Sequence, residues 1–311
     1  MTLDLRGLWV PLVTPFNADD RVDAAALGRL ARRVLADGAR GLVALGTTGE
    51  PATLDADEQR LVIDVCADAC AAAGAPLIIG AGTSSTRATV TAVQALRGVP
   101  GLVAVLVVVP YYTRPSPEAI VDHYRVVATE SPVPVVAYNI PYRTGRGLDA
   151  DHLRALAALT GVAGVKQAVG ALDADTLAVL GAAPPGFHVL SGDDAFIAPT
   201  LLMGGHGAIA AAAHLCTSAF AAMVDAALAG DVLAARRYAD ALLPVVQAGF
   251  AEPSPALWKA ALHAAGEVAS PALRAPMTAA SPAALGYLLD AVATAACSRP
   301  SSQSGLPAAS R

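Results

Sequence analysis

One lysine stands where the chemistry of an amine is expected. Lys166 lies in the apolar stretch VAGVKQAVG, residues 162–170, which is typical of a buried strand. It is one of only two lysines, because 19 of the 21 basic residues are arginine. A desolvated lysine loses its proton more readily than arginine and can form a Schiff base with a carbonyl group. A buried ion pair at a strand end is the alternative interpretation.

Other reactive residue types also follow short apolar runs. The segments are GTTGE (46–50), PYYTRPS (110–116), YNIPYRTG (138–145) and SGDD (191–194). They hold four of the seven tyrosines, and a phenol can exchange protons with a bound substrate. Asp193 and Asp194 are suited to cap the helix that follows them, and Gly192 lets the backbone approach a ligand closely. The second lysine, Lys259, lies in a predicted helical segment away from the strand ends.

The elements that must position these residues alternate along the first two thirds of the chain. The predicted strands are Leu8–Thr14, Gly41–Leu45, Pro76–Gly80, Leu102–Val109, Pro134–Asn139, Val162–Lys166, His188–Ser191 and Ala208–Ala211. The predicted helices between them are Ala24–Ala36, Leu54–Ala73, Thr86–Arg97, Pro117–Ala128, Ala150–Leu159, Ala174–Leu180 and Ala195–Met203. No GxGxxG follows the first strand, so a dinucleotide-binding sheet is disfavoured. Eight strand–helix units predict an α/β fold, a (β/α)8 TIM barrel whose active site lies at the C-terminal ends of the strands.

The last third of the chain is predicted to be helical. Its segments are Ser218–Ala229, Val232–Gln247, Ser254–Ala265 and Pro282–Ala296. We expect residues 1–229 to form the catalytic barrel and residues 230–297 a C-terminal helical extension. Residues 298–311 are rich in Ser and Pro and are predicted to be disordered.

Composition narrows the functional class. With 55% hydrophobic residues, 15% charged residues and a net charge of −5, the chain is typical of a compact protein without the basic surface that nucleic acid requires. It has no apolar run of membrane-spanning length and no signal peptide, so we expect no membrane partner and a cytoplasmic location. Cysteines 66, 70, 216 and 297 and six dispersed histidines do not have metal-site spacing, and we expect no metal.

Taken together, the motifs resemble the dihydrodipicolinate synthase and N-acetylneuraminate lyase family of pyruvate-dependent class I aldolases. The resemblance runs from about residue 7 to about residue 275. It rests on GTTGE, PYY, YNxP, the strand-end lysine, SGDD, GGHG and EPSPALWKAAL.

This resemblance implies a role for several residues. Lys166 matches the lysine that forms the imine with pyruvate, so no separate cofactor is expected. Tyr138 matches the tyrosine that shuttles protons, with a core aromatic as the alternative. Thr47 and Tyr112 match its partners in a hydroxyl relay, Tyr112 reaching across a dimer contact.

Substrate-binding roles are implied for a second set of residues. Thr47 and Thr48 belong to a loop whose backbone N–H groups hold the pyruvate carboxylate, although the same pattern fits a plain tight turn. The remaining positions of this set are Gly49, Gly192 and Ile209.

Arg143 matches the arginine that holds the carboxylate of L-aspartate 4-semialdehyde, and a planar fork suits that group. Arg143 therefore favours a synthase over a sugar-acid aldolase. The alternative interpretation is that Arg143 faces solvent and has no role in binding. Where many synthases have KEATG, this chain has Gln167 and Val169 after its lysine, and Tyr142 is larger than usual. These differences imply a pocket that accepts a different aldehyde.

Three functional hypotheses follow from the sequence. The first is condensation of pyruvate with L-aspartate 4-semialdehyde to 4-hydroxy-tetrahydrodipicolinate, in lysine and diaminopimelate biosynthesis. The second is an aldolase or dehydratase for a 2-keto-3-deoxy sugar acid, and the third a non-catalytic barrel that binds a keto acid.

The resemblance also implies self-association as a homotetramer, a dimer of dimers. Members inhibited by lysine bind it at the dimer contact through polar side chains. The matching positions here are Pro51, Ala56, Gln59, Ser84 and Ala88. Because they offer no charged partner for two ammonium groups and a carboxylate, we expect insensitivity to lysine.

Overall fold

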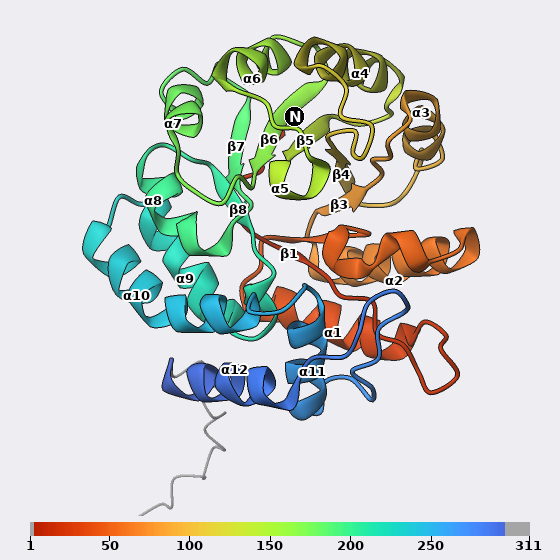
Figure 1. Ribbon diagram of the computed structural model, residues 1–311, viewed down its shortest axis with the longest axis vertical. Coiled ribbons are helices and arrows are strands. Elements are labelled where there is room, and N and C mark those ends of the chain that lie inside the picture. The colour runs from red at the N-terminus through yellow and green to blue at the C-terminus, as the bar shows by residue number, and fades with distance from the viewer. Residues whose placement is uncertain (1–2, 296–311) are drawn as a thin grey trace, which may run out of the picture.

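Eight parallel strands close into a barrel in chain order in the computed structural model, which describes residues 3–295 (Figure 1). The strands are β1 Gly7–Pro11, β2 Gly41–Ala44, β3 Leu77–Gly80, β4 Leu102–Val108, β5 Val135–Asn139, β6 Val162–Gln167, β7 His188–Ser191 and β8 Gly207–Ile209. Trp9 closes the sheet, since it is in register with Gly41 on β2 and with Ile209 on β8. The predicted TIM barrel with C-terminal helices is confirmed.

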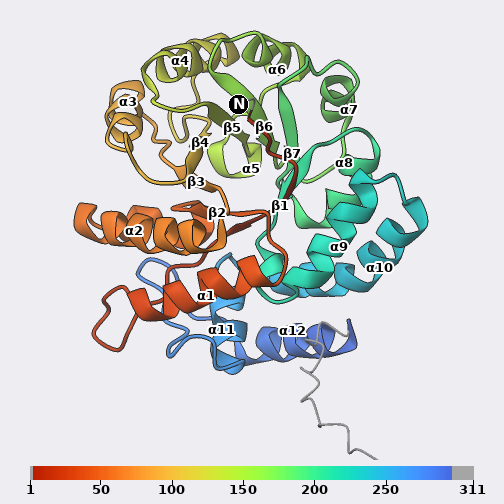
Figure 2. The same ribbon diagram turned by 180° about the vertical axis from the view of Figure 1, so that it is seen from behind.

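Helices form a ring outside the strands, as Figure 1 and the opposite view in Figure 2 show. They are α1 Ala24–Ala36, α2 Ala56–Ala73, α3 Thr86–Gln94, α4 Pro117–Glu130, α6 Ala150–Ala157, α7 Ala174–Leu180, α8 Ile197–Leu202 and α9 Thr217–Leu228. The short helix α5 Pro141–Thr144 lies inside this ring in Figure 1. Aspartate or serine side chains cap most of their N-termini. Asp55 and Glu58, for example, form a reciprocal capping box on α2.

Two buried layers follow from the alternation of side chains along each strand. On β5, Val136 and Tyr138 point into the barrel, whereas Val135 and Ala137 belong to the layer between strands and helices. The floor of the barrel is filled by Trp9, whose indole N–H donates to the Leu5 carbonyl at 3.0 Å. Two consecutive residues at the end of a strand therefore point in opposite directions. Only the one that points into the barrel can contribute to a site at the C-terminal ends of the strands.

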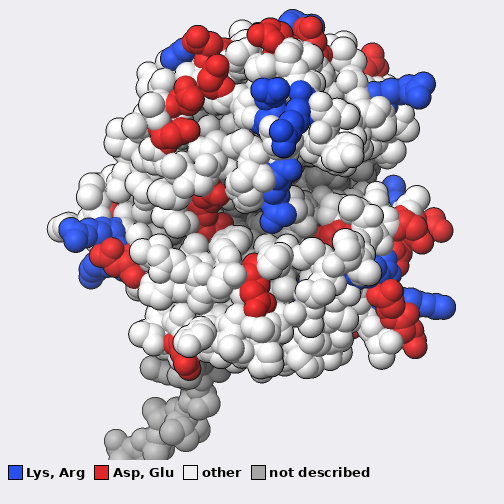
Figure 3. Space-filling view, viewed as in Figure 1, with Lys and Arg blue, Asp and Glu red and all other residues white. Residues whose placement is uncertain are grey.

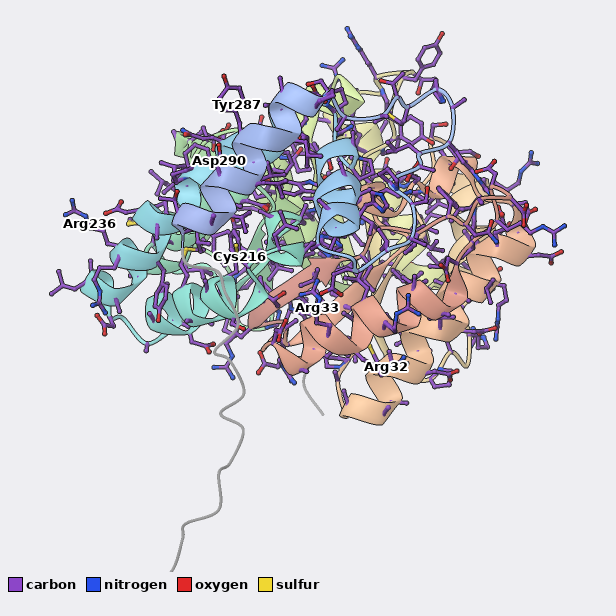
Figure 4. All side chains as sticks on the ribbon, turned by 90° about the horizontal axis from the view of Figure 1, so that it is seen from below. Arg32, Arg33, Cys216, Arg236, Tyr287 and Asp290 are labelled. Atoms are coloured by element: carbon purple, nitrogen blue, oxygen red, sulfur yellow. The ribbon has the colours of Figure 1, made fainter. Side chains whose placement is uncertain are left out.

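Three further helices follow the barrel: α10 Val232–Gly249, α11 Ala256–Ala264 and α12 Pro282–Thr294. Figures 1 and 2 show them on one side of the barrel, beside α1 and α9. Arg33 on α1, labelled in Figure 4, donates to the His214 carbonyl at 2.7 Å and lies 3.3 Å from Glu267 in the segment after α11. The predicted disordered tail, residues 298–311, lies outside the described residues.

Two predicted strands run past the observed ends by more than one residue. β1 ends at Pro11 rather than Thr14, because the Val13 N–H donates to His214 and the Thr14 hydroxyl donates to the Gly49 carbonyl. β8 ends at Ile209, and residues 212–214 form the short 3-10 turn η4, Ala212–His214. The chain thus leaves the sheet early at both strands and is tied to neighbouring loops. Within residues 3–295, no helix is long and apolar enough to cross a membrane.

Candidate active site

Lys166 projects into a cavity of about 620 Å³ at the C-terminal end of the barrel. It is 7% exposed and occupies the same level as Tyr138 on β5 and Leu190 on β7. Its Nζ lies 4.3 Å from the centroid of the Tyr138 ring. Burial lowers the pKa of Lys166 to about 8, although the nearby Asp194 carboxylate acts in the opposite direction. The amine is therefore partly unprotonated near neutral pH, as a nucleophile must be.

Gly192 makes room for this lysine. A Cβ at residue 192 would lie 2.8 Å from Lys166 Cε and 2.9 Å from Ala168 Cβ. Gly192 also lines the cavity. The sequence predicted that this glycine lets the backbone come close to a ligand, and the group that lies close to it here is the Lys166 side chain.

Tyr138 is the phenol closest to the lysine along the sheet. Burial raises its pKa, whereas the Arg143 charge and a hydrogen bond with the Thr47 side chain act to lower it. Thr47 begins the 3-10 turn η1, Thr47–Gly49, directly after β2. A hydroxyl pair, one member on β5 and the other on the turn after β2, therefore stands beside the amine, and it can pass a proton to or from a bound ligand.

The turn η1 also presents backbone donors to the cavity. Thr47 and Thr48 both line it, and neither of their N–H groups donates to an acceptor within residues 3–295. Gly49 lies behind them and does not line the cavity. Its carbonyl accepts from the Thr14 hydroxyl at 2.7 Å, and a Cβ there would lie 3.1 Å from the Leu12 carbonyl. Two free N–H groups side by side form a small anion-binding nest.

On the opposite side of the mouth, the short helix α5 carries Tyr142 and Arg143. Both side chains are exposed and line the cavity, with the Arg143 guanidinium 5.7 Å from the centroid of the Tyr142 ring. Arg146 donates to the Arg114 carbonyl at 3.4 Å and is not part of the lining. Figure 3 shows basic side chains gathered near the position of α5 in Figure 1. This rim favours an anionic ligand.

The predicted capping role of the two aspartates of SGDD is wrong. Asp193 accepts from the Gly170 N–H and Asp194 from the Ala212 N–H, each at 2.6 Å, and neither side chain caps the following helix. They are instead acceptors that join the loop after β7 to the loops after β6 and β8. Burial raises the pKa of Asp194 to about 7.

The two residues after the lysine that differ from the family pattern, Gln167 and Val169, do not reach the cavity. Gln167 points out of the barrel, where it accepts from Asn139 at 3.0 Å and donates to Thr176 at 3.1 Å. Neither Gln167 nor Val169 lines the cavity. Tyr142 is the departure that does contribute to the wall.

Besides Gly49, the structure places one more predicted site residue outside the cavity lining. Ile209, 1% exposed, belongs to the lining together with the lysine. Tyr112 instead lies on the loop after β4, is 91% exposed and does not line the cavity. Its predicted contact with a second subunit remains a prediction.

Sequence reasoning missed one wall of the cavity. The end of α10 and the loop after it contribute Val246, Gln247 and residues 250–254. The EPSP run in that loop marked a break between helices, but nothing in the sequence indicated that it faces the strand ends. Among residues 3–295, no group of His, Cys, Asp or Glu is arranged to hold a metal ion.

Comparisons with known proteins agree with this geometry. Residues 4–294 match the dihydrodipicolinate synthetase family. A 4-hydroxy-tetrahydrodipicolinate synthase of Neisseria meningitidis serogroup B is 38% identical over 273 residues, covering 88% of this chain and 92% of its own. That of Moorella thermoacetica is 39% identical over 268 residues, covering 86% and 90%.

A similar structure is the chloride-inhibited dihydrodipicolinate synthase of Acinetobacter baumannii in complex with pyruvate. It has a TM-score of 0.90 at 30% identity, covering 94% of this chain and 99% of its own. Because the likeness runs through nearly the whole length of both chains, this protein belongs to the dihydrodipicolinate synthetase family, whose members are class I aldolase-like lyases.

Proposed function

We propose that the protein is a 4-hydroxy-tetrahydrodipicolinate synthase, which condenses pyruvate with L-aspartate 4-semialdehyde. The observation that carries this proposal is the buried Lys166 amine, with its lowered pKa, inside a cavity that also has free N–H groups and a basic rim. Enzymes of the family act through such a lysine Schiff base without a cofactor.

In the first half-reaction the Lys166 amine attacks the ketone of pyruvate, and water leaves as the imine forms. The N–H groups of Thr47 and Thr48 hold the pyruvate carboxylate. Tyr138 and the Thr47 hydroxyl move protons to and from the departing oxygen, with Tyr112 of a second subunit as the outer member of the relay. Loss of a methyl proton then gives the enamine.

In the second half-reaction the enamine carbon attacks the aldehyde, whose oxygen takes a proton and becomes the hydroxyl group of the product. Arg143 holds the carboxylate of the semialdehyde. The amino group of that substrate then attacks the imine carbon, which closes the ring and releases Lys166. Gly192 and Ile209 contribute the close-packed surface around the lysine.

A steady-state assay with pyruvate and L-aspartate 4-semialdehyde tests this function. We expect kcat/KM for the semialdehyde to exceed that for 2-keto-3-deoxy sugar acids. The reverse order would reject the synthase and favour the sugar-acid aldolase or dehydratase. That second function is supported by the polar side chains of Gln247 and Ser254 in the cavity wall, which can bind hydroxyl groups.

The proposal also covers the assembly and setting of the protein. A homotetramer built from two dimers explains why Tyr112 projects from the subunit at 91% exposure. The reaction belongs to lysine and diaminopimelate biosynthesis, and the enzyme works in the cytoplasm.

A further inference from the structure

The second lysine lies directly behind the turn that presents the backbone donors. Lys259 is on α11, as the sequence predicts, but the expectation that it lies away from the strand ends is wrong. Its Nζ lies 2.7 Å from Glu50 Oε1, and the two side chains are 0% and 3% exposed. Glu50 is the residue that follows η1, the turn formed by Thr47–Gly49.

Both oxygens of the Glu50 carboxylate have a donor. Oε1 accepts from Lys259 and Oε2 accepts from the backbone N–H of Arg274 at 3.1 Å. The Phe16 ring lies below both cations, with Lys259 Nζ 4.0 Å and Arg274 Cζ 4.4 Å from its centroid. Neither Glu50 nor Lys259 lines the cavity, so this group of charges is buried beside the cavity and outside its lining.

The same group connects the C-terminal helices to the barrel. Lys259 belongs to α11, and Arg274 lies in the segment between α11 and α12. The Arg274 guanidinium donates to both oxygens of Glu58 at the start of α2, and to the Thr53 carbonyl. The turn η1 is therefore held by an ion pair to α11, while the segment after it is held by Arg274.

A buried ion pair is a costly way to achieve stability, since apolar side chains of similar volume often do as well. It does, however, specify one arrangement, because a buried carboxylate must keep its donors. Glu50 also has a left-handed backbone conformation, with φ of 54°, which is uncommon for residues other than glycine. A residue held in this conformation fixes the direction in which the preceding N–H groups point.

We propose that Lys259 is a positioning residue for binding of the keto acid. By pairing with Glu50 it fixes the turn η1, so that the N–H groups of Thr47 and Thr48 converge on the substrate carboxylate. The C-terminal helices thereby determine how tightly pyruvate is held before it reacts with Lys166. This inference rests on the proposed function, in which pyruvate occupies the cavity.

The test is Lys259→Met in the full-length protein, which leaves Glu50 buried without its cation. Borohydride trapping of pyruvate is followed by mass spectrometry over a range of pyruvate concentrations. We expect the half-saturating concentration to rise about tenfold or more, because small displacements of binding groups are costly. The extent of trapping at saturating pyruvate should stay close to that of the unsubstituted protein.

The double variant Glu50→Gln/Lys259→Met leaves no buried charge unpaired but also lacks the ion pair, so it should bind pyruvate about as weakly as Lys259→Met. Val224→Ala, in the fully buried part of α9, is the control for a general loss of stability. It should lower Tm without changing the half-saturating concentration. If Lys259→Met does not fold, Glu50→Gln alone breaks the same ion pair with a side chain of nearly the same shape and provides the same measurement.

The outcomes separate the two proposals. If the unsubstituted protein is not trapped by pyruvate at all, the proposed function fails. If it is trapped, but Lys259→Met or Glu50→Gln behaves like Val224→Ala, the ion pair serves stability alone and the positioning role is overturned. A double variant that recovers the affinity of the unsubstituted protein would also overturn it, since the turn would then be fixed without the ion pair.

Discussion

Lys166 and Tyr138 lie together because neighbouring parallel strands place them at the same level of the barrel. An unperturbed lysine has a pKa of about 10.4, so fewer than about one amine in a thousand is free at pH 7. With the pKa lowered to about 8 by burial, that fraction becomes about one in ten. The barrel interior therefore supplies much of the reactivity that imine formation requires.

The first prediction concerns this amine. Brief treatment with pyruvate and cyanoborohydride should modify Lys166 at a rate that rises with pH up to about 8 and then levels off, because only the free base attacks the ketone. Peptide mass spectrometry at a series of pH values measures this. Lys259 is the internal control, since its fully buried amine is paired with Glu50. An unmodified Lys166 peptide, or a rate independent of pH between 6 and 8, would contradict the imine mechanism.

The second prediction concerns Arg143. Replacement by alanine should lower kcat/KM for aspartate semialdehyde by about tenfold to a hundredfold, because a hydrogen bond to a charged group is typically worth about 1.5–3 kcal/mol. Trapping of pyruvate on Lys166 should change little, since Arg143 is expected to contact only the second substrate. Arg146→Ala, which removes a neighbouring arginine outside the cavity lining, is the matched control. Equal losses in both assays would assign Arg143 a structural role.

At the scale of elements, the strand ends were predictable and the cavity walls were not. A short apolar run followed by polar residues marks a strand end, which is why Lys166, Tyr138 and Thr47 could be grouped from the sequence alone. Whether a side chain points into or out of the barrel depends on the register of its strand, which the sequence does not give. The sequence therefore did not predict that Gln167 points outward to Thr176. The end of α10 contributes to the cavity wall because of the way this helix packs on the barrel. The amphipathic pattern of α10 shows which of its faces is buried, but not against which part of the barrel.

The third prediction uses this alternation. Gln167→Glu restores the carboxylate that many relatives have at this position, but on the outer side of β6. We expect unchanged preference between aldehydes and a loss of stability of about 1–3 kcal/mol, because a charge would be buried against Asn139 and Thr176. Competition assays and urea unfolding measure the two effects. A shift toward another aldehyde would mean that residue 167 influences the cavity after all.

At the scale of the whole molecule, closure of the sheet between β1 and β8 brings the GTTGE turn, Lys166 and the SGDD loop around one cavity. The boundary at residue 229 between barrel and extension stays a prediction. Packing of α10 on α9 and the pairing of Lys259 with Glu50 lead us to expect that a fragment of residues 1–229 unfolds at lower temperature than the full chain.

The fourth prediction concerns assembly and regulation. We expect sedimentation to show a homo-oligomer, and activity to be unaffected by millimolar lysine. In the subunit, the Gln59 amide already donates to the carbonyls of Pro51 and Leu54, at 3.2 Å and 3.1 Å. It has no spare donor for a lysine carboxylate. Saturable inhibition by lysine, or a monomer in solution, would contradict these expectations.

The burial of both lysines also has a practical consequence for bioconjugation. With Lys166 inside the cavity and Lys259 fully enclosed, the folded surface offers amine-reactive dyes or resins no lysine side chain to couple to. Of the two lysines, only Lys166 can then be reached, by a reagent small enough to enter the cavity. Saturating pyruvate should shield it from such a reagent.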